Sequence, residues 1–234
     1  ACMRAVTRAA RRLGEAHSRG LTLVFGTALP MRAEETAEGD PCPGPLANAL
    51  LAYRDGHLLA YYDKRLLPTY DVFDEDRYFT PGRVPVIIEV AGVRVGLSIC
   101  EDLWHGRDAG FAHRYADAPE PIAELCKPPD GAPGAQVIIN PSASPFVLGK
   151  GQRQREILQR HARERGVWIA AVNQVGGNDD LVFDGHAAVY DPRGELVGAG
   201  AGFVEGMIIT NVGRPAPSVS RLAPLALVGG DHAP

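Results

Sequence analysis

Two different spacings of apolar residues along this chain mark the helices and strands that it is expected to form. Apolar residues recur every three or four positions over 6–16, which predicts an amphipathic helix that Gly20 ends. The same spacing over 149–165 places Ile157, Leu158 and Ala162 on one face of a second, otherwise polar and basic helix. The nearly continuous apolar run 21–25 is typical of a central strand that is covered on both faces.

Short apolar runs on either side of turn residues predict three β-hairpins. The first joins 47–53 to 57–62, the second joins 84–90 to 93–99, and the third joins 187–190 to 195–197. Further strands are expected over 136–140, 167–172 and 204–212. The polar segment 31–46 is expected to be a surface loop, and 105–135 a long excursion rich in Pro and Gly.

Hairpins that alternate with helices argue against a purely parallel sheet and predict a mixed α/β (α+β) fold. Helices would cover either one large mixed sheet or two sheets lying face to face. We expect one domain over residues 1–212, and we expect 213–234, which is rich in Pro, Ala and Ser, to be a linker or a mobile tail.

Composition excludes several classes of protein. The 234 residues are 45% hydrophobic and carry a net charge of −4 without a basic block, which does not favour a nucleic-acid partner. No apolar run approaches the roughly 20 residues needed to span a bilayer, and the start of the chain does not resemble a signal peptide. The four cysteines are widely spaced and the seven histidines show no ligand spacing, so we predict a cytoplasmic setting and no metal site.

Cys100 is the first candidate for chemistry, because it ends a strand-like run and is followed at once by Glu101-Asp102-Leu103-Trp104. A cysteine at the carboxyl end of a buried strand is a position suited to a nucleophile. Taken alone, it could equally be a core cysteine that packs as a small hydrophobe.

Lys64 is the second candidate, because it lies where a predicted strand runs into a loop dense in aromatic and acidic residues. A lysine at such a place could stabilise an oxyanion or lower the pKa of a thiol, although a solvated surface lysine is the alternative. A third stretch runs from Asn140 through Ser144 to Lys150, where small residues after a strand leave room for a ligand and a basic residue suits a carboxylate.

Together these stretches resemble the nitrilase superfamily, whose members cleave carbon–nitrogen bonds with a Glu-Lys-Cys set. The closer resemblance is to the family of glutaminase domains in glutamine-dependent NAD synthetases. Four motifs carry it in order: 64–79 around the lysine, 99–104 around the cysteine, Asn140 to Pro145, and 173–185. The resemblance implies a four-layer α-β-β-α sandwich.

The resemblance also implies roles for the residues that match. Cys100 would attack the side-chain amide of L-glutamine and form a thioester, and Lys64 would stabilise the tetrahedral intermediate together with the backbone N–H after Cys100. Tyr70, Ser144 and Lys150 match positions that bind glutamine, and Glu101 would belong to the acidic surroundings of the nucleophile.

In this family the general base is a glutamate well upstream of the lysine. The chain opens without methionine inside a predicted helix, so we expect that its beginning is missing and the glutamate with it. None of Glu15, Glu34 and Glu35 is a suitable replacement. Because general acid–base help is worth roughly 10²–10⁴-fold, the chain by itself is predicted to be inactive or nearly so.

The resemblance further implies that ammonia passes to a synthetase domain, and that the chain assembles into a homo-oligomer. The Ser-Gly-Gly-x-Asp-Ser loop of that synthetase domain does not occur in this sequence. We therefore expect no cofactor in this domain, since ATP and the NAD precursor would bind to the synthetase domain.

Two other hypotheses stay open from the sequence. The chain could be another amidase or carbamoylase of the nitrilase superfamily, which a panel of substrates would decide. It could also be a truncated, non-catalytic interaction module, whose exposed sheet edge would favour association.

Overall fold

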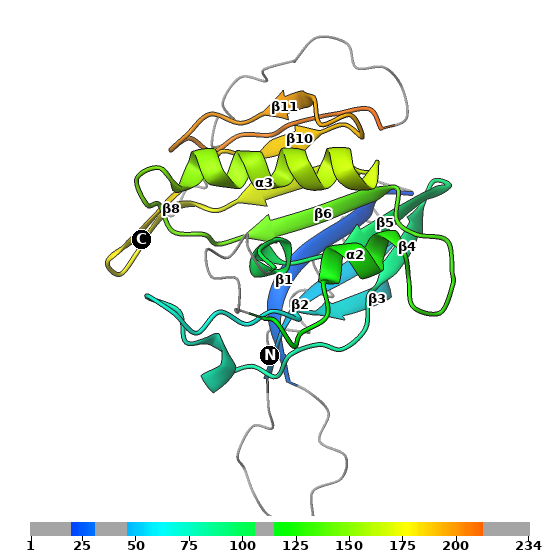
Figure 1. The fold of residues 1–234 in the computed structure, drawn as a ribbon, viewed down its shortest axis with the longest axis horizontal. Coiled ribbons are helices and arrows are strands. Elements are labelled where there is room, and N and C mark those ends of the chain that lie inside the picture. The colour runs from blue at the N-terminus through cyan, green and yellow to red at the C-terminus, as the bar shows by residue number, and fades with distance from the viewer. Residues whose placement is uncertain (1–19, 31–45, 106–114, 213–234) are drawn as a thin grey trace, which may run out of the picture. The chain divides into compact units, whose positions relative to one another are not determined.

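The computed structural model describes residues 20–30, 46–105 and 115–212. The predicted helix over 6–16, the predicted loop 31–46 apart from Leu46, and the tail 213–234 lie outside this part. The chain divides into two compact units, Ala1–Pro141 and Ser142–Pro234. The turn that carries Cys100 follows a strand of the first unit, so this unit is described first (Figure 1).

An antiparallel sheet opens the first unit, with β1 (Thr22–Pro30), β2 (Leu46–Arg54) and β3 (His57–Asp63) in that order. The predicted hairpin between β2 and β3 is confirmed, and its turn residues Asp55 and Gly56 have φ values of 49° and 79°. Two successive residues with positive φ are typical of a type I′ turn, which matches the twist of paired strands.

The prediction for 21–25 is wrong in one respect. In the described sheet β1 is an edge strand that pairs with β2 alone, and most of its side chains are half-buried or exposed. An apolar run indicates a strand but does not say how many neighbours the strand has.

The second set of strands in this unit consists of β4 (Ile87–Val90), β5 (Val93–Leu97) and β6 (Val137–Ser142), the last residue of which begins the second unit. The β4–β5 hairpin is confirmed, and β5 pairs with β6 in parallel. The connection from β5 to β6 carries two short helices, η2 (Cys100–Leu103) and α2 (Pro121–Cys126). Another short helix, η1 (Glu75–Arg77), lies in the loop after β3.

The two groups of strands share one hydrophobic core. Its buried members are Leu50, Ala52, Tyr62, Ile88, Leu97 and Ile99, contributed by β2, β3, β4, β5 and the residues just after β5. Because each large apolar side chain buried here contributes about 1.5–3 kcal/mol, this core fixes the strand ends from which the loops with Lys64 and Cys100 start.

The second unit contains α3 (Lys150–Arg165), β7 (Trp168–Asn173), β10 (Ala188–Tyr190) and β11 (Leu196–Ala199), and α3 lies along β7 and β10 (Figure 1). The helix, the β7 strand and the β10–β11 hairpin are confirmed, and Ile157, Leu158 and Ala162 are buried as predicted. Gly166 ends α3 with a φ of 63°, a conformation that suits glycine at a helix terminus.

Two features of the second unit differ from the predictions. The sequence did not predict the hairpin of β8 (Val175–Asn178) and β9 (Leu181–Asp184), which the chain forms inside the 173–185 motif. The expected strand over 204–212 is wrong, because the structure shows no strand there and Val204, Met207 and Ile209 are exposed.

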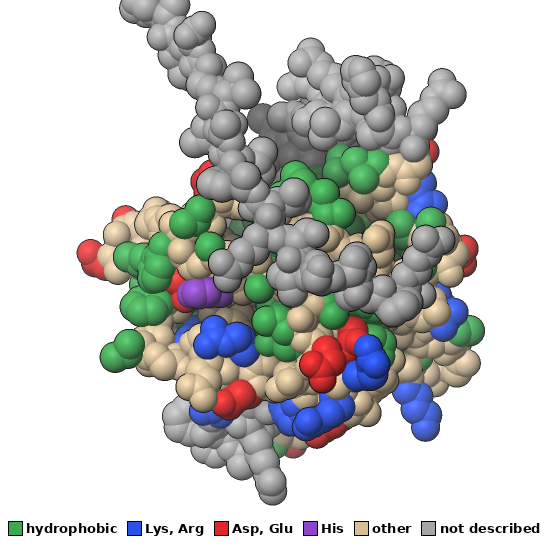
Figure 2. Space-filling model, turned by 90° about the horizontal axis from the view of Figure 1, so that it is seen from above, with side chains coloured by type: hydrophobic (Ala, Val, Ile, Leu, Met, Phe, Trp, Pro, Cys, Tyr) green, Lys and Arg blue, Asp and Glu red, His purple; other side chains and the backbone are tan. Residues whose placement is uncertain are grey.

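Acidic, basic and hydrophobic side chains are interspersed over the described part of the face shown in Figure 2. None of the helices in the described ranges has the length and apolar character needed to cross a membrane.

Candidate active site around Cys100

Cys100 begins the turn that follows β5, and its backbone has a φ of 42°. A left-handed conformation is uncommon for a residue other than glycine and stores strain, which tends to occur at functional sites. A sharp turn directly after a buried strand also presents a nucleophile on rigid support, as the nucleophile turn of α/β-hydrolases does. The thiol is half-buried. This geometry supports the nucleophile hypothesis over that of a core cysteine.

Asp102 connects the cysteine turn to the segment that follows Lys64. Its carboxylate is fully buried and accepts four hydrogen bonds, from Ile99 N (2.8 Å), Tyr62 Oη (2.7 Å), Arg65 N (3.1 Å) and Leu66 N (3.0 Å). Burial raises the pKa of the Asp102 carboxyl, although the hydrogen bonds and the charge of Lys64 oppose that rise. One carboxylate therefore holds both segments that carry the predicted chemistry.

Lys64 is not the surface residue that the alternative interpretation required, since only 1% of it is exposed. Its ammonium donates to Glu75 Oε1 at 2.6 Å, and Glu75 Oε2 accepts from Asn48 Nδ2 at 3.2 Å. On the backbone, Lys64 N donates to Asn48 O. The lysine is thus fixed at both its backbone and its side chain.

The sequence reasoning missed Glu75. The stretch after Lys64 was recognised as rich in carboxylates, but Asp74, Glu75 and Asp76 are all acidic and nothing in the sequence distinguishes them. The η1 turn selects Glu75 by directing that carboxylate to the ammonium of Lys64, whereas Asp74 pairs with Arg77 on the exposed surface.

Glu101 lies next to the nucleophile and is 4% exposed. Tyr70 Oη donates to both of its carboxylate oxygens at 2.9 and 3.0 Å, so the structure brings these two predicted site residues together. A second phenol, that of Tyr115, donates to Glu101 Oε1 at 3.0 Å. Tyr115 belongs to the long excursion, to which the sequence analysis assigned no site residue.

The Asn-Pro-Ser motif contacts the segment before the nucleophile through Asn140. Its Nδ2 donates to Ser98 Oγ at 3.0 Å, and Ser98 Oγ donates to Ile139 O at 2.9 Å. These bonds join the carboxyl ends of the parallel strands β5 and β6, the edge of a sheet where open α/β folds place their sites.

The other two predicted site residues, Ser144 and Lys150, lie in the second unit. Ser144 is buried, and its backbone exchanges hydrogen bonds with the Asn173 side chain at 2.8 and 3.1 Å. Lys150 is the first residue of α3 and is half-buried. Asn173 opens the fourth motif, so two motifs distant in sequence meet within this unit.

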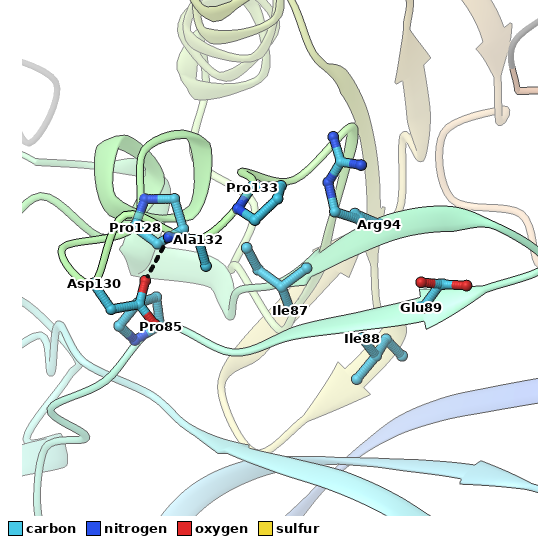
Figure 3. Close-up of a pocket in the computed structure, with 9 residues that line it drawn as sticks. All are labelled: Pro85, Ile87, Ile88, Glu89, Arg94, Pro128, Asp130, Ala132 and Pro133. Atoms are coloured by element: carbon cyan, nitrogen blue, oxygen red, sulfur yellow. Dashed lines mark hydrogen bonds between the residues drawn. The ribbon is translucent and has the colours of Figure 1, made fainter.

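A pocket of about 370 Å³ lies elsewhere in the first unit, beside the β4–β5 hairpin (Figure 3). Its wall is formed on one side by Ile87 and Arg94, and on the other by the 128–133 loop, where Asp130 accepts a hydrogen bond from Ala132 N. None of the predicted site residues lines it. Within the described ranges, no group of three or more His, Cys, Asp or Glu side chains is arranged to hold a metal ion.

A thiol on a strained turn, a buried ammonium and a buried carboxylate form a set that suits nucleophilic attack on a carbonyl carbon with charge stabilisation. Comparison with known proteins agrees with this chemistry, because a model of the carbon–nitrogen hydrolase family matches residues 130–216. The chain belongs to the carbon–nitrogen hydrolase (nitrilase) superfamily, an enzyme class.

Within this superfamily the similarity to glutamine-dependent NAD(+) synthetases is confirmed. The chain is 37% identical to that of Aquifex aeolicus over 163 residues, which cover 70% of this chain and 26% of the relative. It is 31% identical to that of Synechocystis sp. over 197 residues, 84% of this chain and 33% of the relative. The chain therefore spans only about a quarter to a third of the length of these relatives.

Solved structures confirm the nitrilase-type fold class. The glutamine-dependent NAD+ synthetase of Acinetobacter baumannii, determined in complex with ADP, matches 92% of this chain and 37% of its own, with a TM-score of 0.69 and 27% identity. An amidase from Nesterenkonia sp. matches 84% of this chain and 62% of its own, with a TM-score of 0.62 and 24% identity, and shows the fold alone.

Proposed function

We propose that the site of this chain is built for hydrolysis of the side-chain amide of L-glutamine through a thioester on Cys100. The observation that carries the proposal is the Asp102 carboxylate, which binds the backbone on both the Cys100 side and the Lys64 side of the site. That arrangement fixes a nucleophile relative to a cation, as the attack on an amide requires, because an amide is a poor electrophile.

The reaction would proceed in two steps. The Cys100 thiolate attacks the amide carbon, and the resulting oxyanion is stabilised by the Lys64 ammonium and by the backbone N–H of Glu101. The intermediate collapses when a proton reaches the leaving nitrogen, which releases ammonia and leaves the glutamyl group on the sulfur. Water then attacks the thioester, releases glutamate and restores the thiol.

Four residues would recognise glutamine. The buried Glu101 carboxylate, held by Tyr70, suits the substrate's α-ammonium group. The similarity to the synthetases supports Tyr70, Ser144 and Lys150 as further contacts, with Lys150 suited to the α-carboxylate.

The similarity to glutamine-dependent NAD(+) synthetases also supports the proposed destination of the ammonia, a synthetase domain where ATP and the NAD precursor would bind. The domain described here would then need no cofactor of its own. Assembly into a homo-oligomer and a cytoplasmic location belong to the same proposal.

The test is intact-protein mass spectrometry after treatment with the glutamine analogue 6-diazo-5-oxo-L-norleucine. The thiol proton passes to the diazo carbon, the Cys100 sulfur displaces N₂, and a stable thioether remains. We expect a single adduct on Cys100, and none on a Cys100→Ser variant. Equal labelling of all four cysteines, or none, would contradict the proposal and favour a non-catalytic module. Labelling by other ω-amide analogues but not by this one would favour another amidase or carbamoylase.

The expectation that the chain is inactive or nearly so stays a prediction. Release of glutamate from L-glutamine, measured on the preparation used for labelling, tests it separately from the assembly of the site. Adduct formation without turnover is the expected pair of results, since general acid–base help is worth roughly 10²–10⁴-fold. Turnover that Cys100→Ala abolishes would contradict it.

A further inference from the structure

We infer that Asn48, on β2, is a positioning residue that directs the Lys64 ammonium for the stabilisation of an oxyanion. This inference rests on the function proposed above, because Asn48 acts on Lys64 through Glu75. Asn48 O accepts from Lys64 N at 2.8 Å. Asn48 Nδ2 donates at 3.2 Å to Glu75 Oε2, and the other oxygen of that carboxylate, Oε1, accepts from Lys64 Nζ at 2.6 Å. A residue of a paired strand therefore holds both the backbone of the lysine and the carboxylate that binds its ammonium.

The Glu75 carboxylate depends on Asn48 for its orientation. Among the described residues its two oxygens have one donor each, Lys64 Nζ on Oε1 and Asn48 Nδ2 on Oε2. The terminal torsion of a glutamate side chain has broad minima, so a carboxylate that is held at one oxygen can rotate. The bond from Asn48 holds the second oxygen, and the plane of the carboxylate is thereby defined.

The direction of the Lys64 ammonium follows from that plane. An ammonium has three N–H donors, and in the described part of the chain Glu75 accepts one of them. Because the nitrogen is tetrahedral, the Cε–Nζ bond and the bond to Glu75 together fix the directions of the other two donors. Lys64 is only 1% exposed, so these donors are shielded from bulk water. Donors that are placed in advance at a shielded position are those that stabilise a developing oxyanion best.

The loop between Lys64 and Gly82 is attached to β2 by backbone bonds that do not involve the Asn48 amide. Lys64 N donates to Asn48 O, Thr80 N donates to Leu46 O, and Gly82 N donates to Lys64 O, each at 2.8 Å. A substitution of the Asn48 side chain leaves all three bonds possible. Such a substitution should therefore change the orientation of the Glu75 carboxylate and keep the loop in place.

The experiment compares the full chain with Asn48→Leu, which removes the amide and keeps a side chain of similar size. The reagent is the γ-p-nitrophenyl ester of L-glutamate. The Cys100 sulfur attacks the ester carbonyl carbon, the thiol proton passes to the buffer, and the carbonyl electron pair moves onto oxygen. The return of that pair expels p-nitrophenolate and leaves a γ-glutamyl thioester. Because p-nitrophenolate departs without a proton, this reaction forms the oxyanion but needs no general acid.

Iodoacetamide is the second reagent, since displacement of iodide by the Cys100 sulfur creates no oxyanion. Intact-protein mass spectrometry measures both rates. Hydrogen bonds to charged groups typically change an equilibrium by about 10- to 100-fold, so Asn48→Leu should lower the maximal rate of Cys100 acylation by about 10-fold or more. The ester concentration that gives half of this rate should be unchanged, because Asn48 is not one of the proposed glutamine contacts. Alkylation by iodoacetamide should be unchanged as well.

The matched control is Asn211→Leu, because Asn211 is exposed and lies outside the four motifs. This variant should react like the parent chain with both reagents. An Asn48→Leu chain that the ester acylates at the parent's maximal rate would overturn the inference and leave the proposed function standing. Equal slowing with both reagents would also overturn it, since general structural damage has that effect. A parent chain that iodoacetamide alkylates at Cys100, but that the ester does not acylate there, would refute the proposed function and this inference with it.

Discussion

Replacement of Asp102 by asparagine tests whether its carboxylate fixes the Cys100 turn relative to the segment that follows Lys64. The substitution keeps the shape of the side chain but exchanges one acceptor oxygen for an NH₂ group. If the NH₂ group occupies the Oδ1 position, it faces two backbone donors, Arg65 N and Leu66 N. If it occupies the Oδ2 position, it faces Ile99 N and the phenol of Tyr62, which can rotate its hydroxyl hydrogen and accept. The second orientation is therefore preferred and leaves one buried N–H, that of Ile99, without an acceptor.

The expected loss of stability follows from this one unsatisfied N–H group. One buried donor without a partner costs about 1–3 kcal/mol, and the other hydrogen bonds lose their charge assistance. The relief of burying a neutral amide instead of a carboxylate whose pKa is raised by burial offsets part of this loss. We expect Asp102→Asn to lower the free energy of unfolding by about 2–4 kcal/mol.

The assays are urea denaturation and the rate of Cys100 labelling by 6-diazo-5-oxo-L-norleucine. The control is Asp130→Asn, because Asp130 is exposed and accepts one backbone hydrogen bond, from Ala132 N. The control should change stability by less than about 1 kcal/mol and leave labelling intact. If Asp102→Asn has no larger effect than the control on either quantity, the argument that Asp102 connects the two segments is wrong.

Three further predictions concern the lysine, the strained turn and an acidic turn residue. Glu75→Gln should slow the labelling of Cys100 by 6-diazo-5-oxo-L-norleucine by about 10-fold or more, because the Lys64 ammonium loses its charged partner. Peptide mapping measures the labelling rate, and an unchanged rate would contradict the prediction. Cys100→Gly should be about 1 kcal/mol more stable than Cys100→Ala in urea, because glycine adopts a φ of 42° without strain; equal midpoints would show that the turn is relaxed. Burial alone would raise the pKa of Asp191, but hydrogen bonds from Glu195 N and Arg193 N and the Arg193 guanidinium hold it below its usual value. Its contribution to stability is therefore present above about pH 4 and is lost as the pH falls through the lowered pKa of Asp191. Asp191→Asn should reduce stability at pH 7, and this loss should shrink as the pH falls below about 4, which paired urea titrations would test.

Local chemistry explains which elements the sequence could predict. The three hairpins are visible because short turns such as Asp55-Gly56 separate apolar runs, and α3 is visible because its buried residues repeat every three or four positions. The β8–β9 hairpin was not predicted because Val175–Asn178 is mostly exposed and shows no alternation of buried and exposed residues. The strand expected over 204–212 is wrong because apolar residues there, among them Met207 and Ile209, are exposed and not packed in a core.

The residues of the candidate site also fall into those that the sequence predicts and those that it does not. Cys100 and Lys64 were identified from the elements that precede them and from the family motifs. Glu75 and Tyr115 were not, because each depends on a turn whose conformation the residue types do not determine: η1 selects one of three neighbouring acids, and a left-handed φ directs one tyrosine. Three of the four donors to Asp102 lie 36 to 40 residues upstream, so only the folded chain reveals them.

The burial of Lys64 has a practical consequence for anyone who prepares this protein. The chain has three lysines, and while Lys127 is exposed, Lys64 is 1% exposed and paired with Glu75. A brief pulse of an amine-acylating reagent should therefore modify Lys127 in the native protein and reach Lys64 only after the first unit has unfolded. Acylation of Lys64 would then report unfolding at the same residue on which the chemistry of the site depends.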